Sequence, residues 1–410
     1  MLKPMLLVFC TPSLRAIALT LLLSSASLSS VAPYQAIVAI REIGLDETAY
    51  GALLLLTAAI SVVFSIVAGI MADQKHLRKQ FVLFSLACGC FGQLLIFVLP
   101  VPLVFVLSGL FLIPPMLTVY SQLFAAARVV SDELGASADQ AIAGVRSILA
   151  LSWVAVPPII SLALALGMPI PGVYAVASAI CFTAFALVVL LKPDLQRAMA
   201  PPSHGKESAS ILSGFAEISQ IFIIARVMAF GLIFGSQFLF MTIYGLIIVS
   251  TNDGSDVDVG IFQGALALLE IPFIIIASGL LTRMIKSDLI VVGAVVFGIF
   301  VILLGYSSDI LVIYLLLIPG AFGNAVIVSI SIGYLQDLMA HKPGAASSLI
   351  TVSNFVGVTC SSLSFATLSS MLSYQDISMV AGIIGIAGAF LLFYLDRTNI
   401  AALKPTKVSA

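Results

Sequence analysis

Long apolar runs alternate with short polar segments along the whole chain. A helix that crosses a bilayer needs about 20 mainly apolar residues, because the hydrocarbon layer is about 30 Å thick. The alternating strands of a transmembrane barrel, roughly ten residues each, are absent from this pattern. The runs therefore predict twelve transmembrane helices. They cover residues 11–33, 49–71, 80–99, 101–127, 141–167, 171–192, 220–249, 259–283, 288–306, 309–335, 344–371 and 377–395.

Composition leads to the same class of protein. Charged residues make up 9% of the 410 residues and hydrophobic residues 61%, whereas a soluble domain has roughly 25% charged residues. The chain is therefore predicted to be an all-α integral membrane protein, with the lipid bilayer as its surroundings. Its net charge of −1 gives no basic surface for a nucleic-acid partner. The five cysteines lie in or beside apolar runs, which predicts small buried residues rather than disulfides or a metal site.

Most of the 18 basic residues lie in loops on one side of the predicted helices. Lys and Arg accumulate in short cytoplasmic loops, so both termini are expected in the cytoplasm and the number of helices is even. The N-terminus has a second interpretation, because its basic residues, apolar run and "SSASLSSVA" resemble a cleavable signal peptide. Basic loops alternate with acidic loops along the chain, and this alternation is consistent only if the first helix is retained. The pattern therefore favours twelve helices.

The longest polar stretch between helices contains "KPDLQRAMAPPSHGKESAS" and divides the helices into six and six. Offsets near 210 residues pair Arg15 with Arg226 and Tyr34 with Tyr244. These matches support two parallel six-helix repeats, an arrangement in which substrate lies between the halves near the bilayer midplane. We expect an N-terminal half at 1–192, a cytoplasmic linker at 193–219, a C-terminal half at 220–397 and a cytoplasmic tail at 398–410.

The loop after the second predicted helix reads "GIMADQKHLRK" (69–79) and resembles the loop signature of the major facilitator superfamily, GxLADRxGRR. Gly69, Asp73 and Arg78 fit the signature, whereas Gln74 and His76 replace its usual Arg and second Gly. The resemblance implies the major facilitator fold of two six-helix repeats, with this loop as a gating element. The two departures leave the usual salt-bridge set of the loop incomplete.

Three further segments resemble the sugar efflux transporter family. They read "RSILALSWVAVPPI" (146–159), "LEIPFIIIASGLL" (269–281) and "GYLQDLMAHKPGAASSL" (333–349). The resemblance implies a secondary transporter of a bacterial inner membrane that exports a sugar or glycoside by alternating access, as a proton-driven antiporter. Drug-efflux members of the superfamily also carry Pro and Gly in the fifth helix, so efflux of a drug or another small molecule is the alternative.

Glu270 is the one carboxyl group deep in a predicted helix, roughly 16 Å from the helix end at 1.5 Å per residue. A charged group at this depth costs about 2.5–3.5 kcal/mol on insertion scales, and such groups face a cavity or a partner. Apolar surroundings favour the neutral form of a carboxyl group, which suits proton uptake or hydrogen bonding to sugar hydroxyls. The alternative is a structural role at a kink beside Pro272. Glu270 is the first candidate for substrate or proton coupling.

The fifth predicted helix carries two further candidates. Arg146 lies near its cytoplasmic end, where its guanidinium either extends to the interface or presents donors to sugar oxygens. Trp153, the only tryptophan, lies about two turns deeper, away from the interfaces where tryptophan usually gathers. Its ring can stack on a sugar, or it can pack against Pro157 and Pro158, which interrupt the helix.

Neutral polar side chains complete the candidate site, because a sugar is uncharged and rich in hydroxyl groups. Amides offer donors and acceptors together, which suits neighbouring hydroxyls. The alternative is that they bridge helices. These candidates are Tyr120, Gln122, Gln237, Tyr244, Asn324 and Asn354.

Enzyme chemistry is poorly supported by the sequence. The chain has three histidines, all in predicted loops, and no ATP-binding loop, metal cluster or Ser/His arrangement. No large soluble domain is present for a sensor that does not transport. The expected partners are a small-molecule substrate and protons, with no cofactor, and the protein is expected to be a monomer.

Overall fold

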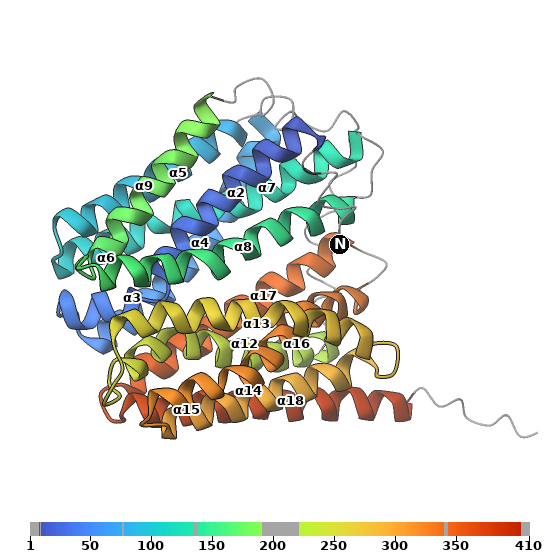
Figure 1. Ribbon diagram of the computed structural model, residues 1–410. Helices are drawn as coiled ribbons and strands as arrows, with labels where there is room; N and C mark the ends of the chain where they lie inside the picture. The colour runs from blue at the N-terminus through green and yellow to red at the C-terminus, as the bar shows by residue number, and fades with distance from the viewer. Residues whose placement is uncertain are drawn as a thin grey trace, which may run out of the picture. The chain divides into compact units, whose positions relative to one another are not determined.

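The computed structural model describes residues 8, 10–75, 78–133, 138–190, 221–339 and 343–402. Within these residues every regular element is a helix (Figure 1), and twelve stretches are long and apolar enough to cross a membrane. The predicted all-α fold with twelve membrane-spanning segments is confirmed. The predicted linker at 193–219 lies outside the described residues, as does the tail beyond residue 402.

The membrane-spanning helices of the N-terminal half begin and end within several residues of the predicted positions, whereas α3 (Gln35–Ile37) and the π-helix η1 (Val38–Glu42) were not predicted. The membrane-spanning helices are α2 (Pro12–Val31), α4 (Glu47–Lys75), α5 (Arg78–Val98), α6 (Pro102–Phe111), α7 (Ile113–Glu133), α8 (Ala138–Ala165) and α9 (Gly172–Leu190).

The helices of the C-terminal half follow the prediction equally closely, with one extension at the end of the chain. They are α12 (Ile221–Ile248), α13 (Asp256–Leu280), α14 (Lys286–Tyr306), α15 (Ile310–Leu315), α16 (Leu317–Asp337), α17 (Pro343–Leu368) and α18 (Tyr374–Ala402). The last helix continues past residue 395, where the apolar run ends. Its polar end is stabilised by contacts with other helices, because Arg226 bonds to Asp396 at 2.6 Å and Arg397 approaches Asp288 at 3.5 Å.

The fourth and tenth spans each consist of two helices, whereas the apolar runs predicted one helix each. The breaks fall at Leu112, between α6 and α7, and at Leu316, between α15 and α16. Pro114 and Pro319 follow closely, and proline both lacks the N–H donor and clashes with the carbonyl four residues earlier. The segments "FLIPP" (111–115) and "LLIPG" (316–320) thus place the same distortion in both halves.

The chain divides into two compact units. The first comprises Met1–Lys206 and Ser255–Gly264, and the second comprises Glu207–Gly254 and Ala265–Ala410. In the first unit α2 packs against α8 and α9, and α5 packs against α7 and α9. In the second unit α18 packs against α12 and α14, while α17 packs against α12 and α16 against α14.

Small residues bring the helices of each unit close together. In the first unit Ser25 Oγ lies 2.6 Å from Ser152 Oγ, and Ser27 donates to Gln93 Oε1 at 3.0 Å. Such hydroxyl contacts between helices are common in membrane bundles. The serine-rich face of α2 is therefore a packing surface.

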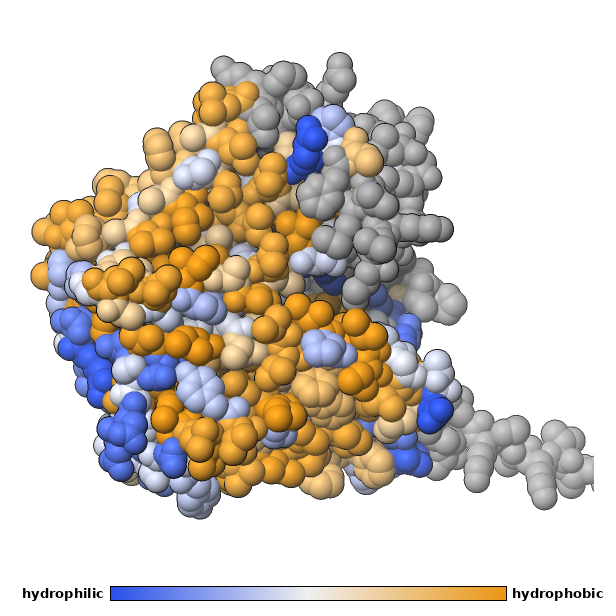
Figure 2. Space-filling view, in the orientation of Figure 1, coloured by the Kyte–Doolittle hydropathy of each residue, from blue (hydrophilic) through white to orange (hydrophobic). Residues whose placement is uncertain are grey.

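Aromatic side chains fill the centre of the second unit. The ring centre of Phe240 of α12 lies 5.6 Å from that of Phe297 and 5.4 Å from that of Phe300, both on α14. Both ring pairs are edge to face. All three side chains are buried. Outside this core the visible helix faces are covered by hydrophobic residues, and hydrophilic residues gather near helix ends (Figure 2). This distribution fits helices whose outer faces contact lipid.

Gly323 provides a test of the α14–α16 packing. A Cβ atom at Gly323 would lie 2.7 Å from both Gly293 O and Phe297 N of α14. We expect Gly323→Ala to lower the free energy of unfolding by about 1–3 kcal/mol, because overpacking has a cost of this size. The measurement is thermal unfolding of the purified protein in detergent.

Gly279→Ala is the matched control for Gly323→Ala. A Cβ atom at Gly279 of α13 meets no heavy atom within 4 Å, so its effect should stay within about 0.5 kcal/mol. Equal effects of the two substitutions would contradict the close packing of α14 and α16.

Candidate functional site

Three of the predicted site residues meet in the second unit. Asn324 Nδ2 of α16 donates a hydrogen bond to Glu270 Oε1 of α13 at 2.7 Å, and Gln237 Nε2 of α12 donates to Asn324 Oδ1. All three side chains are partly buried. We call Gln237, Asn324 and Glu270 the Glu270 row. The structure therefore connects three candidates that the sequence identified one by one, from helices far apart along the chain.

The Glu270 row lies near the middle of its helices. Glu270 is near the centre of α13, Gln237 is in the second half of α12, and Asn324 is near the centre of the span that α15 and α16 form together. The row is therefore placed within the hydrocarbon layer when these helices span a membrane. Polar side chains at that depth mark functional positions by default, because their desolvation is costly.

Glu270 has no cationic partner near it in its own unit. Among the described residues of the second unit, no Lys, Arg or His side chain lies within ion-pair distance of its carboxyl group. The neighbouring contact between the same helices is apolar, because Phe273 of α13 packs edge to face on Phe322 of α16 at 5.6 Å. Its polar contact with the unit is thus the neutral Asn324 amide, which donates a hydrogen bond to it.

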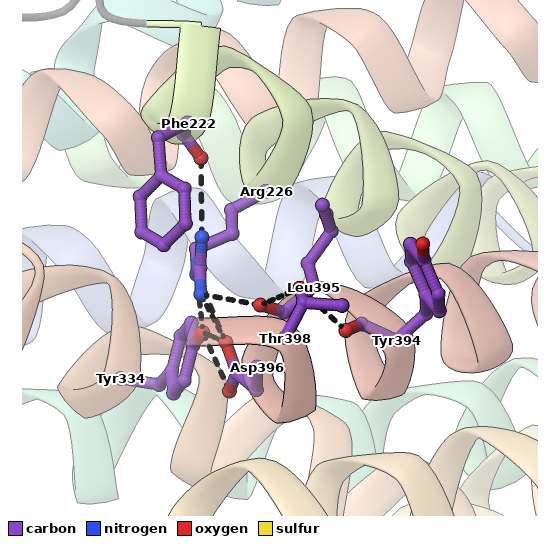
Figure 3. Close-up of polar contacts among 7 residues, drawn as sticks. All are labelled: Phe222, Arg226, Tyr334, Tyr394, Leu395, Asp396 and Thr398. Atoms are coloured by element: carbon purple, nitrogen blue, oxygen red, sulfur yellow. Dashed lines mark hydrogen bonds and ion pairs between the residues drawn. The ribbon is translucent and has the colours of Figure 1, made fainter. Parts of the chain in front are cut away.

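A second polar cluster lies near the C-terminal end of α16 and contains a buried ion pair (Figure 3). Arg226 of α12 is 3% exposed, and its Nη2 lies 2.6 Å from Asp396 Oδ1 of α18. Tyr334 of α16 donates to Asp396 Oδ1 at 2.8 Å and accepts from Arg226 Nε at 3.0 Å. Arg226, Tyr334 and Asp396 form the Arg226 cluster.

Backbone and aromatic groups complete the surroundings of Arg226. Its Nη1 donates to Phe222 O and its Nη2 to Leu395 O, both at 3.2 Å, and its guanidinium carbon lies 3.7 Å from the centre of the Phe222 ring. A buried guanidinium needs such partners for its donors. Arg226 is therefore fixed inside the second unit by these partners.

The two polar groups form separate layers. On α12, Gln237 lies eleven residues beyond Arg226, and on α16, Tyr334 lies ten residues beyond Asn324. At 1.5 Å per residue, the rise along each helix between the two groups is roughly 15 Å. The same separation on two helices places the layers at two depths. The Arg226 cluster belongs to the ends of its helices, and the Glu270 row belongs to their middle.

The Arg226 cluster was missed by the sequence analysis. The predicted final helix stopped at residue 395, which left Asp396 outside the membrane. The available signal was the pair of opposite charges at helix ends on the same predicted side. The repeat partner of Arg226 behaves differently, because Arg15 of α2 is exposed.

Two other candidates of the second unit are engaged elsewhere. Tyr244 is fully buried and stacks on Phe240 with ring centres 5.1 Å apart. Asn354 of α17 donates to the carbonyl of Ile350 in its own helix at 2.9 Å. In this conformation Tyr244 cannot contact a solute, because its side chain has no exposed surface, and Asn354 does not join the Glu270 row.

The remaining candidates lie in the first unit. Arg146 of α8 is exposed, and its guanidinium carbon lies 5.8 Å from the centre of the Phe124 ring. Trp153 of α8 is partly buried. On α7, Tyr120 is partly buried and Gln122 is 4% exposed.

The gating-loop candidates are only partly described. Gly69 lies within α4, with no heavy atom within 4 Å of an added Cβ, and Arg78 at the start of α5 is 6% exposed. The side chain of Asp73 lies outside the described residues. Among the described residues no group of three or more His, Cys, Asp or Glu side chains could hold a metal ion.

Comparison with known proteins gives a consistent result. The profile of the Major Facilitator Superfamily matches residues 17–358. Sugar efflux transporter A of Dickeya chrysanthemi is 28% identical over 348 residues, which cover 83% of this chain and 84% of that protein. Sugar efflux transporter C of Escherichia coli (strain K12) is 28% identical over 290 residues, which cover 68% and 70%.

The solved structure of the nucleoside transporter NupG is similar to this chain as well. Its TM-score is 0.77 at 13% sequence identity, and the match covers 94% of this chain and 99% of that one. At this identity the similarity concerns the fold alone.

Proposed function

This chain belongs to the major facilitator superfamily, and from that membership we propose that it exports a sugar or a glycoside in exchange for protons, by alternating access. The coarser conclusion, a multi-pass membrane transporter of small molecules, follows from the family and its relatives. The finer one is supported by the sugar efflux relatives and by the chemistry of the Glu270 row.

The polar row suits an uncharged solute. Gln237 and Asn324 supply amide donors and acceptors, and Glu270 supplies a carboxyl group, near the middle of their helices. Sugar hydroxyls both donate and accept, so they can bond to all three groups. A solute with several charges would need more ionised partners than the middle of these helices contains.

Proton exchange is supported by the position of Glu270, which is the observation that carries the proposal. A carboxyl group at mid-membrane depth, bonded to an amide and without a cation beside it in its unit, can change its charge by binding or releasing a proton. Proton relays in transporters use such groups. We assign to Glu270 the role of proton-coupling residue.

Two residues of α8 are proposed to help bind the solute. Trp153 would stack its ring on the apolar face of a sugar, and the exposed guanidinium of Arg146 would bond to its oxygens. The loop that contains Gly69, Asp73 and Arg78 is proposed as a gating element. The protein is proposed to act as a monomer in a bacterial inner membrane, with cytoplasmic termini and without chemical conversion of its cargo.

Efflux from intact cells tests the cargo. Cells that produce the protein and are preloaded with a labelled, non-metabolised glycoside should lose the label several-fold faster than control cells. An uncoupler should remove the difference, because exchange then has no proton gradient to use. Retained label together with faster loss of a cationic dye would overturn the sugar assignment and favour drug efflux.

A further inference from the structure

The hydrogen bonds of the Glu270 row run in one direction. Gln237 donates to the carbonyl oxygen of Asn324, and Asn324 donates to Glu270 Oε1. Asn324 thus uses its acceptor and one of its donors within the protein. Among the described residues of the second unit, Asn324 is the one hydrogen-bond partner of Glu270, which leaves Oε2 without a protein donor there.

The backbone beneath Asn324 is held firmly in place. Gly323, the preceding residue, packs so closely on α14 that a Cβ would lie 2.7 Å from Gly293 O and Phe297 N. One turn earlier, Gly320 packs on the Phe300 ring, with an added Cβ 2.9 Å from its atoms. The side chain of Asn324 is oriented by Gln237, and its main chain is supported by α14.

The part of α13 that follows Glu270 is less closely packed than α16 at Gly323. Gly279 meets no atom within 4 Å of an added Cβ, and Glu270 is followed by Pro272, which removes a backbone donor from the helix. Two contacts that join this part of α13 to α16 are the Asn324–Glu270 hydrogen bond and the Phe273–Phe322 ring pair. The amide is therefore the polar group that fixes the carboxyl group.

We propose that Asn324, oriented by Gln237, is a positioning residue that holds one oxygen of Glu270 and leaves the other for the proton and the solute hydroxyl. This inference rests on the proposed role of Glu270 in proton-coupled export. It goes beyond the role of Asn324 as a contact of the solute, because its Oδ1 atom and one of its Nδ2 hydrogens already bond within the row.

The other titratable groups of α12 and α16 are engaged away from Glu270. Arg226 of α12 and Tyr334 of α16 belong to the Arg226 cluster with Asp396. Asp337 at the end of α16 pairs with Lys286 at 2.6 Å. Tyr244 of α12 stacks on Phe240. The polar group that contacts Glu270 is thus the neutral amide of Asn324, which in turn accepts from the neutral amide of Gln237.

A double-mutant cycle tests the positioning role. The variants are Glu270→Gln, Asn324→Leu and the double variant, and the readouts are proton-coupled efflux and solute exchange in the absence of a proton gradient. We expect Asn324→Leu to lower coupled efflux about 10- to 100-fold, because a hydrogen bond to a charged group contributes roughly 1.5–3 kcal/mol. In the Glu270→Gln background, the same substitution should change exchange less than about twofold, because residues acting through one another are not additive.

Gln93→Leu is the matched control for the cycle. Gln93 is a buried amide of the first unit that bonds to Ser27 and Met116, so its effect should add to that of Glu270→Gln. If Asn324→Leu does not reach the membrane, Asn324→Ser gives the same comparison with a smaller, polar side chain.

The outcomes separate this inference from the function on which it rests. Coupled efflux that survives Glu270→Gln would overturn the proposed role of Glu270. Loss of coupling in Glu270→Gln together with an additive effect of Asn324 on exchange would overturn only the positioning role.

Discussion

Replacing Glu270 by glutamine is expected to abolish proton-coupled efflux while the protein stays in the membrane at its usual amount. Glutamine has nearly the same shape and can still accept the hydrogen bond from Asn324, which Glu270 Oε1 accepts at 2.7 Å. It cannot bind or release a proton, however, so solute exchange should persist and dependence on the proton gradient should disappear. The measurement is efflux from preloaded cells at several external pH values, with protein abundance measured alongside.

Asp258→Asn is the matched control for this substitution. Asp258 lies in the first turn of the same helix and bonds to the hydroxyl of Ser255 at 2.6 Å, near the aqueous end. We expect its variant to keep the acceleration of efflux by external acid that the wild type shows. An unchanged pH response in Glu270→Gln would reject Glu270 as the coupling group.

Replacing Asp396 by alanine is expected to lower the free energy of unfolding by about 3–5 kcal/mol, the usual effect of removing one partner of a buried ion pair. Arg226 is 3% exposed and Asp396 is 17% exposed, so the variant leaves a guanidinium inside the bundle without its carboxylate. Tyr334 would also lose its acceptor. The measurement is thermal unfolding in detergent together with the amount of protein in the membrane.

Two variants control for this effect. Asp288→Ala removes the partner of Arg397 in an exposed pair 3.5 Å apart, so its effect should be about 0–1 kcal/mol. The double variant Arg226→Met with Asp396→Leu removes both charges and should recover most of the lost stability, because apolar replacement of a buried pair is often neutral. A mild effect of Asp396→Ala, equal to that of Asp288→Ala, would contradict the structural importance of the Arg226 cluster.

The sequence was sufficient to predict the membrane-spanning helices, because the length of an apolar run determines whether it crosses a bilayer. It did not predict the breaks at Leu112 and Leu316. Hydrophobic patterns do not register a backbone distortion, although Pro114 and Pro319 were visible signals. The Ile-Pro pair that both spans share follows closely after each break and marks its position.

The three residues of the Glu270 row were candidates from the sequence, but the hydrogen bonds between them were not predicted. Glu270 was conspicuous because a carboxyl group at that depth is costly. Asn324 and Gln237 were two amides among several, and only the fold shows that they bond to one another and to Glu270. Tyr244 was an equally plausible candidate from the sequence, yet its ring stacks on Phe240 in the aromatic core.

The roles of the charged residues depended on which helix face they occupy. Arg226 and Arg15 occupy matching positions in the repeats, but the first is buried beside Asp396 and the second is exposed. A short error at the end of the last helix was enough to hide this pair, because Asp396 lies one residue beyond the predicted boundary.

The most direct test of the account is proton movement driven by solute in liposomes that contain the purified protein. A sugar gradient across the membrane should drive protons in the opposite direction through the wild-type protein, detected with a trapped pH-sensitive dye. Glu270→Gln should exchange labelled sugar without moving protons. Sugar movement without proton movement in the wild type, or equal proton movement in both proteins, would contradict the central claim that Glu270 couples export to protons.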